Sequence, residues 1–359
     1  MSDSDDILFG REGGVGTVLL NRPQALNAFT LGMYRQFDPA LRNWAADPAV
    51  HAVLIEGAGD RAFCAGGDVR AVYEAGKGLS GDRSFTSVFF AEEYRIISFI
   101  HHYPRPYVAI IDGITMGGGA GISVNGAYRV ATENTMFAMP ETGIGLFPDV
   151  GATRFLNLCP GHIGRYLGLT GVRLGAADAL YCGFATHFVP HERVPELRAA
   201  LTGLAWEDGR ERAQVEAVLD RFNEDPGPPP LAARRAVIDR CFTGDSIEAI
   251  LDALQSETGD PQWAAETRAL LLTKSPTSLR ITSRQLTLGQ GLDLEAALRL
   301  EYRMTQHVMA AHDFYEGVRA ALVDKDQRPH WRPASLAEVD ERTAEAYFAP
   351  LGEGELTFD

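Results

Sequence analysis

The chain of 359 residues is poor in cysteine and lysine and lacks any long apolar run. Its four cysteines include no C-x-x-C pair, so the sequence supports neither a disulfide framework nor a zinc site. No run of 18 apolar residues is present, so we expect no membrane-spanning helix. The acidic start, Met1-Ser-Asp-Ser-Asp-Asp6, is the opposite of a signal or transit peptide. We therefore expect a cytoplasmic protein in a reducing compartment.

Positive charge is also scarce. The 33 Lys and Arg residues against 48 Asp and Glu give a net charge of −15, and lysine occurs only at Lys77, Lys274 and Lys325. Phosphate contacts need a basic surface, so this balance argues against a nucleic-acid partner. It does not predict a cationic substrate, because a few local arginines decide the charge of a pocket. At roughly 150 residues per domain, the length predicts about two domains or one elaborate domain.

Several familiar catalytic motifs are missing. The sequence has no G-x-x-x-x-G-K-[ST] loop and no H-E-x-x-H pair, which removes the signatures of nucleotide hydrolysis and of a zinc protease. The serine hydrolase motif G-x-S-x-G fails at its last position in Gly121-Ile-Ser-Val-Asn125. The glycines of 117–121 do not match G-x-G-x-x-G in spacing, so a dinucleotide-binding fold is weakly supported.

Short strands and helices alternate in the first part of the chain. Thr30 is placed to cap a helix in which Met33, Phe37 and Leu41 recur at helical spacing. From about residue 160 the pattern becomes mostly helical, with Ser246 and Ser278 as candidate caps. The expected strands are 15–20, 52–55, 61–64, 107–111, 129–131 and 184–189, and the expected early helices lie within 88–100 and 117–125. The segment 223–230 has four prolines, which remove donors and fix φ, so we predict a linker there.

Two glycine-rich loops each follow a predicted strand. The first is Ala62-Phe-Cys-Ala-Gly-Gly-Asp68, and the second, Ile114-Thr-Met-Gly-Gly-Gly-Ala-Gly121, opens a helix. Glycine allows backbone to approach a ligand closely, and the N–H groups at a helix start favour negative charge. Two such N–H groups converging on one point would hold an oxyanion. The alternative is that each loop is only a tight turn or a close contact between a helix and a strand.

A third segment, 139–151, has two carboxylates among apolar residues, glycines and prolines. Apolar surroundings raise the pKa of an acid such as Glu141, which suits a general base near neutral pH. Pro140 and Pro148 each precede a carboxylate and stiffen its backbone. Asp149 has a simpler interpretation as the cap of a helix that starts near Val150.

Together these segments resemble the crotonase, or enoyl-CoA hydratase/isomerase, superfamily. Further blocks resemble the branch of that superfamily that hydrolyses 3-hydroxyisobutyryl-CoA, and the resemblance covers essentially the whole chain. These further blocks include Phe89-Phe-Ala-Glu-Glu-Tyr94, Gly145-Leu-Phe-Pro-Asp-Val-Gly151, Ser275-Pro-Thr-Ser278, Glu301-Tyr-Arg303 and His312-Asp-Phe-Tyr-Glu-Gly-Val-Arg319, while Asn21-Arg-Pro23 supports the superfamily as a whole.

The resemblance implies an α/β fold, a spiral of repeated strand-strand-helix units followed by a mostly helical C-terminal region. We accordingly expect a core at 1–222 that contains the active site, the linker at 223–230 and a helical region at 231–359. The resemblance also implies an enzyme that hydrolyses the thioester of 3-hydroxyisobutyryl-CoA or a similar short 3-hydroxyacyl-CoA, in valine catabolism. Coenzyme A would enter as part of the substrate, so no separate cofactor and no metal are expected.

The resemblance assigns roles to named residues. Gly67 and Gly118 would form the oxyanion hole. Glu141 would be the catalytic carboxylate, with Asp149 as its partner. The resemblance places Glu93, Ala65 and Asp68 among the substrate-binding residues, although Glu93, beside Glu92, could instead be a solvated helix residue.

One position departs from the wider superfamily. In hydratases a second catalytic glutamate follows the glycine triplet by two residues, and here that position is Gly121. Hydration needs a pair of acid and base groups over the double bond, so it is disfavoured here. A hydratase or isomerase of the same fold and a non-catalytic acyl-CoA-binding protein remain as alternatives. A homo-oligomer is possible, since the superfamily commonly forms trimers and hexamers.

Overall fold

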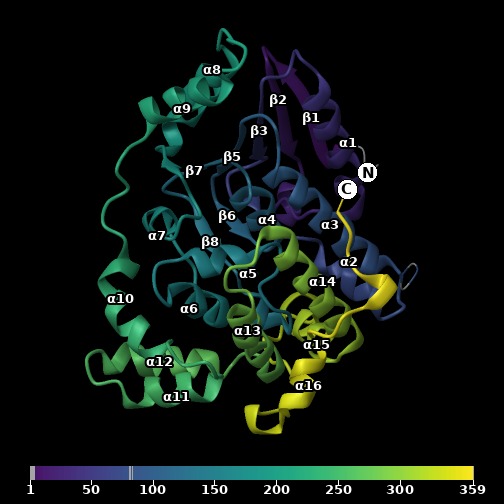
Figure 1. Cartoon of the computed structure of the whole chain (residues 1–359), viewed down its shortest axis with the longest axis vertical. Helices are drawn as coiled ribbons and strands as arrows, with labels where there is room; N and C mark the ends of the chain where they lie inside the picture. The colour runs from purple at the N-terminus through teal and green to yellow at the C-terminus, as the bar shows by residue number, and fades with distance from the viewer. Residues whose placement is uncertain (1–4, 81, 83, 359) are drawn as a thin grey trace. The chain divides into compact units, whose positions relative to one another are not determined.

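The computed structural model describes residues 5–80, 82 and 84–358, which form two compact units. The first unit contains residues 1–67, 96–138 and 173–229, and the second contains 68–95, 139–172 and 230–359. The chain therefore passes from one unit to the other several times. Figure 1 labels the helices and strands and colours the chain by residue number. The three consecutive regions expected from the sequence stay a prediction, although residues 223–229 form neither helix nor strand.

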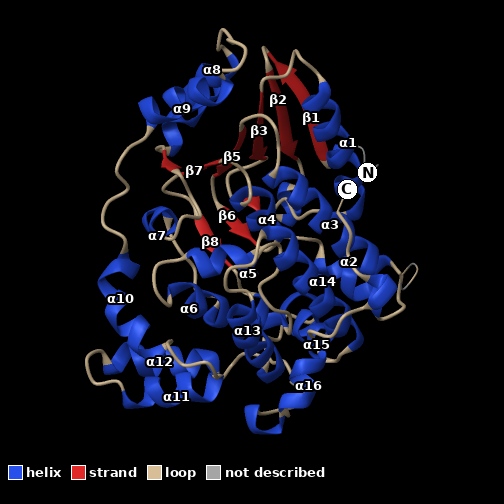
Figure 2. Cartoon of the chain, in the orientation of Figure 1, coloured by secondary structure: helices blue, strands red, loops and turns tan. Residues whose placement is uncertain are grey.

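The first unit contains every strand found in the described residues (Figure 2). Its six-stranded sheet has the order β1-β2-β3-β5-β7-β9, and a three-stranded sheet has the order β4-β6-β8. Among the strands of the described residues, β1 and β2 are the one antiparallel pair. The strands are β1 Ile7–Glu12, β2 Val15–Leu20, β3 Ala52–Gly57, β4 Ala62–Cys64, β5 Tyr107–Ile111, β6 Ile114–Met116, β7 Tyr128–Ala131, β8 Met136–Ala138 and β9 His187–Phe188.

The two sheets alternate along the chain. The strand β3 of the large sheet is followed by β4 of the small one, β5 by β6, and β7 by β8. The helix α4 (Gly118–Val124) follows the second of these strand pairs, and α1 (Leu31–Ala46) connects β2 to β3. The Thr30 hydroxyl accepts the Met33 N–H and so caps α1 as expected. This repetition confirms the predicted strand-strand-helix architecture.

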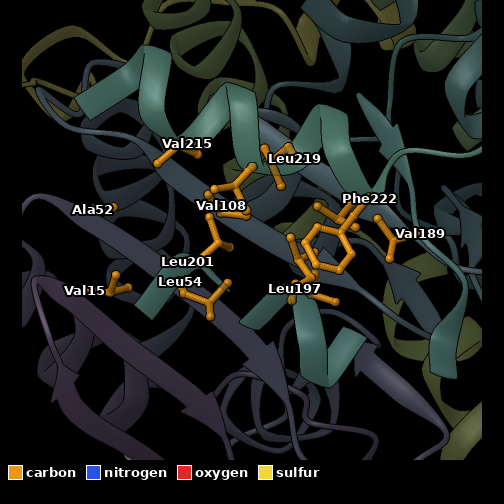
Figure 3. Packing of buried hydrophobic residues seen from close by; sticks show 13 residues of the cluster. Val15, Ala52, Leu54, Val108, Val189, Leu197, Leu201, Val215, Leu219 and Phe222 are labelled. Carbon is orange, nitrogen blue, oxygen red and sulfur yellow. The ribbon is translucent and has the colours of Figure 1, made fainter. Parts of the chain in front are cut away.

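An apolar core covers one face of the large sheet. Every residue of β5 is buried, as expected of a parallel strand covered on both faces. The helices α8 (Val194–Thr202) and α9 (Glu211–Phe222) contribute Leu197, Leu219 and Phe222 to a cluster with Leu54 and Val108 of the sheet (Figure 3). Burial of aliphatic side chains thus stabilises the large sheet, whose strands β3 and β5 lead directly into β4 and β6, the strands that the glycine loops follow.

The regular elements of the second unit are all helices, since its described residues include no strand. Ser246 caps α11 as expected, but the predicted cap Ser278 is wrong: Ser275 caps α13 and accepts the Ser278 N–H. Pro276 explains the shift, because proline fits the first position of a helix. The helices are α2 Val69–Gly76, α5 Ala152–Phe155, α6 Ile163–Thr170, α10 Pro230–Cys241, α11 Ile247–Ser256, α12 Pro261–Leu271, α13 Pro276–Leu288, α14 Leu294–Ala310, α15 Asp313–Val318 and α16 Glu341–Ala346.

The helix α3 (Phe85–His101) contributes residues to both units, and α7 (Ala176–Tyr181) belongs to the first unit. Among the described residues, we find no helix with the length and apolar character needed to cross a bilayer.

Candidate active site

The two glycine loops meet in the first unit. Both use left-handed backbone, with φ of 116° at Gly66 and 49° at Gly117. A Cβ atom added to Gly66 would lie 3.5 Å from the Gly118 nitrogen and 3.3 Å from the Met116 carbonyl oxygen. Parallel pairing of β4 with β6 explains this approach, because the carboxyl ends of the two strands lie at the same edge.

The amides of Gly67 and Gly118 are available at this meeting point. Gly118 is the first residue of α4, so its N–H has no acceptor within the helix. Among the described residues, neither this N–H nor that of Gly67 donates to a backbone carbonyl. The second glycine loop also allows α4 to pack closely on β4, since a Cβ atom at Gly119 would lie 2.2 Å from the Cys64 carbonyl oxygen. The close packing of α4 on β4 and the two N–H groups without a backbone acceptor therefore occur together. The N–H groups of Gly67 and Gly118 can bind an oxyanion.

Ala65 and Asp68 flank this loop. The Ala65 N–H donates to the Leu26 carbonyl oxygen over 3.0 Å, so it is occupied. The Asp68 carboxylate accepts the Ala71 N–H over 3.2 Å and caps α2. Both residues have structural contacts, and their part in substrate binding stays a prediction.

The predicted carboxylates lie in the second unit. Glu141 starts a short 3₁₀ helix, Glu141–Ile144, and only 5% of its surface is exposed. Asp149 is buried to a similar degree, and its Oδ2 accepts the Tyr94 hydroxyl over 2.6 Å. The interpretation of Asp149 as a helix cap is wrong, because Gly151 occupies the cap position of α5 and the Asp149 side chain bonds to Tyr94 instead.

Glu93 is buried on α3, beside Tyr94 in sequence. The alternative of a solvated helix residue is therefore wrong for this glutamate. Its charge is among the causes that raise the pKa of Glu141. Glu93 thus belongs to the electrostatic surroundings of the predicted catalytic carboxylate.

Burial dominates the electrostatics of this cluster. It raises the pKa of Glu141 well above its ordinary value, and the negative charges of Asp149 and Glu93 raise it further. Burial also raises the pKa of Asp149, while the hydrogen bond from Tyr94 lowers it. Within the described part of the chain, the buried Glu141 Oε2 has no hydrogen-bond partner. This oxygen is therefore available to accept a proton or to attack an electrophile.

Glu301 of α14 supports the turn that follows Asp149. Its two carboxylate oxygens accept the N–H groups of Gly151 and Thr153, each over 2.8 Å. Between Asp149 and Gly151, Val150 has a φ of 59°, which is strained for a β-branched residue. Burial raises the pKa of Glu301 to about 8. Sequence reasoning assigned no role to Glu301 or Tyr94, although both lie in blocks that carry the family resemblance.

A separate cluster could hold a metal ion. In the first unit His51, Asp208 and Glu211 have potential ligand atoms within 4.8 Å of one another. Asp208 is exposed, and the His51 Nδ1 lies 3.8 Å from the Glu211 carboxylate. None of these residues is among the predicted site residues, and the expectation of no metal stays a prediction.

Comparisons with known proteins add family relationships to this geometry. The Enoyl-CoA hydratase/isomerase family matches residues 15–348. The curated 3-hydroxyisobutyryl-CoA hydrolase of Xenopus tropicalis is 46% identical, with 98% of this chain and 90% of the relative covered. The human protein of the same name is 42% identical, with 99% and 91% covered.

Two solved structures are similar over nearly their full lengths. A carnitinyl-CoA dehydratase from Mycobacterium thermoresistibile has a TM-score of 0.90 and 43% identity, with 99% of each chain covered. An enoyl-CoA hydratase from Rhodobacter sphaeroides has a TM-score of 0.88 and 39% identity, with 98% of this chain and 100% of that chain covered. These similarities agree with the crotonase fold expected from the sequence.

The curated relatives correct one expectation. They are named as mitochondrial proteins, which contradicts the predicted cytoplasmic location. The prediction rested on acidic first residues and a low cysteine content. Cysteine content separates oxidising from reducing compartments, but it does not tell one reducing compartment from another.

Proposed function

Because the chain belongs to the enoyl-CoA hydratase/isomerase family, we propose that it hydrolyses the thioester of 3-hydroxyisobutyryl-CoA, a step of valine breakdown. The products are the free hydroxy acid and coenzyme A. One observation above the others supports this substrate: curated 3-hydroxyisobutyryl-CoA hydrolases are 42% to 46% identical to this chain over at least 97% of its length. A near relative such as 3-hydroxypropionyl-CoA has the same reacting groups.

The glycine amides have the first role in this mechanism. The N–H groups of Gly67 and Gly118 bind the thioester oxygen, which becomes negatively charged when the carbonyl carbon is attacked. In other enzymes one such donor lowers the barrier by about 3 kcal/mol. Support comes from the approach of the two loops and from the lack of other acceptors for these N–H groups within the described residues.

Glu141 has the second role, and two routes fit its buried oxygen. In the first, Oε2 takes a proton from water as the water attacks the thioester carbon. In the second, Oε2 attacks that carbon itself, coenzyme A thiolate leaves, and water then hydrolyses the resulting anhydride. A single turnover in ¹⁸O water tests for the second route. Label in the Glu141 carboxylate shows that water attacked the Glu141 carbon of an anhydride, whereas the first route places label only in the product.

Asp149 completes the proposed site. Its Oδ2 is bonded to Tyr94, so we assign Oδ1 to the 3-hydroxyl of the substrate or to the orientation of Glu141. A buried acceptor left without that hydroxyl disfavours acyl groups that lack it. This assignment predicts preference for 3-hydroxyacyl esters over their plain acyl analogues.

Hydration of an enoyl ester is the rival function, since the two similar solved structures are a carnitinyl-CoA dehydratase and an enoyl-CoA hydratase. Against it, Gly121 lies buried within α4 and has no side chain to serve as a second acid or base. A third function, binding of acyl-CoA without chemistry, would leave the buried Glu141 and Asp149 without a use.

A substrate panel tests the proposal. Thiol release is measured with 3-hydroxyisobutyryl-CoA, 3-hydroxypropionyl-CoA and isobutyryl-CoA, and hydration is followed by the ultraviolet absorbance of crotonyl-CoA. We expect thiol release from the two hydroxy esters, little from isobutyryl-CoA, and no hydration. Hydration of crotonyl-CoA without thiol release would establish the rival, and tight binding of the esters with no reaction would establish the binding protein.

A further inference from the structure

A cavity of about 260 Å³ lies in the first unit, away from the glycine loops. It is formed where α3 ends, where β5 begins and where α4 ends, and α9 contributes one residue. Its lining includes His101, Arg105, Tyr107, Arg129 and Arg212. The seven residues of α4 separate this end from Gly118 by about 10 Å at 1.5 Å per residue.

The charge of this cavity contrasts with that of the protein. The chain has a net charge of −15, yet the described residues that line the cavity include three arginines and no Asp or Glu. In the described part of the chain, none of these arginines forms an ion pair. Three guanidinium groups beside one cavity therefore have no carboxylate within ion-pair distance among the described residues.

Arg129 is fixed in place by carbonyl oxygens. Its guanidinium donates to Gly126 and Gly183 over 3.0 Å and 2.8 Å, with further bonds to Ala127 and Phe184. Carbonyl oxygens hold the group but do not neutralise it. Burial accordingly lowers the pKa of Arg129 to about 10, so an anion in the cavity would supply the missing charge.

Other hydrogen-bond donors of the residues that line the cavity have few acceptors within the described residues. The Arg105 Nε and the Tyr107 hydroxyl are both buried and have no hydrogen-bond partner among the described residues, and Tyr107 is 0% exposed. Arg212 donates one bond, to the Tyr103 carbonyl oxygen over 3.3 Å. The Arg105 Nε and the Tyr107 hydroxyl are enclosed by the protein, so an anion in the cavity would be reached by the terminal nitrogens of Arg105, one of which makes a long bond of 3.4 Å to the Asp47 carbonyl oxygen, and by the remaining donors of Arg212.

We propose that this cavity binds an oxyanion of the phosphate type, held by Arg105 and Arg212 in the field of the fixed Arg129. Guanidinium groups match the geometry of such oxyanions, and several of them at one point favour a doubly charged group over chloride. The anion is either free phosphate or the phosphate group of a nucleotide. The proposed thioester hydrolysis does not depend on this site.

Calorimetric titration of the full chain with inorganic phosphate tests the proposal. The ionic strength is held constant with sodium chloride, and the wild type is compared with Arg105→Gln and Arg212→Gln. Arg210→Gln is the matched control, because Arg210 lies two residues from Arg212 and already pairs with Glu207 over 2.7 Å. A parallel titration with adenosine 3',5'-diphosphate distinguishes the two sources of the anion.

We expect saturable phosphate binding that weakens about tenfold or more in Arg105→Gln and Arg212→Gln, with Arg210→Gln unchanged, as loss of a hydrogen bond to a charged group implies. If Arg105→Gln does not fold, the exposed Arg212 provides the test. Adenosine 3',5'-diphosphate binding that weakens in the same variants identifies a nucleotide, and weakening for phosphate alone identifies the free ion. No phosphate binding beyond that of chloride, or equal affinities in all variants, would overturn the proposal.

Discussion

At the scale of single residues, the second unit concentrates buried acids around Glu141. Glu93, Glu141 and Asp149 are each at most 5% exposed. Burial and the neighbouring negative charges disfavour the charged form of Glu141, and burial disfavours that of Asp149, so both pKa values are raised above their ordinary values. A carboxylate with such a pKa can accept a proton and return it within one turnover.

Asp149→Asn changes the pH dependence of the reaction. The ionised form of Glu141 is the active one, so kcat/KM falls as the pH drops through its raised pKa. Removing the Asp149 charge removes one cause of that rise, and we expect the acidic midpoint to move to lower pH while the rate also falls. The profile of kcat/KM from pH 4 to 9 measures this, and an unchanged or higher midpoint would contradict the assignment.

Tyr94→Phe removes the hydroxyl that donates to Asp149. A hydrogen bond to a charged group contributes about 1.5–3 kcal/mol, so we expect a loss in kcat/KM of about tenfold or more. Tyr302→Phe is the matched control, because its hydroxyl donates to the Ser87 carbonyl oxygen and its ring packs against Tyr94. Equal effects of the two substitutions would show that the Tyr94 hydroxyl has no special role.

At the scale of elements, close packing of α4 on β4 places the Gly118 amide. Gly119→Ala would bring a Cβ atom to 2.2 Å from the Cys64 carbonyl oxygen, so the helix must shift. We expect a loss of about 1–3 kcal/mol in the free energy of unfolding, typical of overpacking, together with reduced turnover. Gly175→Ser is the control, because nothing lies within 4 Å of a Cβ there. Urea unfolding and thiol release measure both effects, and wild-type values for Gly119→Ala would refute this account.

The turn between Asp149 and α5 depends on Glu301. In Glu301→Gln a single amide oxygen replaces two acceptors, so one of the two backbone N–H groups it holds loses its partner. We expect about 1–3 kcal/mol lower stability and a lower kcat with little change in KM, because Asp149 loses its support. Thermal unfolding and steady-state kinetics test this prediction. Full stability and full kcat would assign Glu301 no positioning role.

The sequence predicts the position of some strands better than that of others. The apolar strands 15–20 and 107–111 were predictable, because buried parallel strands give continuous apolar runs. The strand expected at 184–189 shortens to His187–Phe188. The three residues of β8 are too few to show any periodicity, and the strand was missed.

The sequence likewise predicts only part of the candidate site. The glycine loops and Glu141 follow from local sequence, because turn chemistry and residue type are local properties. The contact between Tyr94 and Asp149 joins residues 55 positions apart, and that between Glu301 and Gly151 joins residues 150 apart. Such partners depend on tertiary packing, which is why the cap interpretation of Asp149 was wrong.

At the scale of the whole molecule, the residues of the proposed chemistry are divided between the two compact units. The oxyanion donors Gly67 and Gly118 belong to the first unit, and Glu141 and Asp149 belong to the second. The chain connects the two sets directly, since Ala138 ends β8 and Glu141 follows three residues later. Each unit is built from three separate segments of the chain. A change of composition along the sequence marks boundaries between consecutive regions, so it cannot reveal units of this kind.

The most direct test of the proposed hydrolysis is the kcat for thiol release from 3-hydroxyisobutyryl-CoA by the wild type and by Glu141→Gln. Glutamine keeps the size of the side chain but can neither accept a proton at neutral pH nor act as a carboxylate nucleophile. We predict a fall of about 10²–10⁴-fold, with binding of the ester and the unfolding temperature retained. Turnover by Glu141→Gln within tenfold of the wild type would contradict the account.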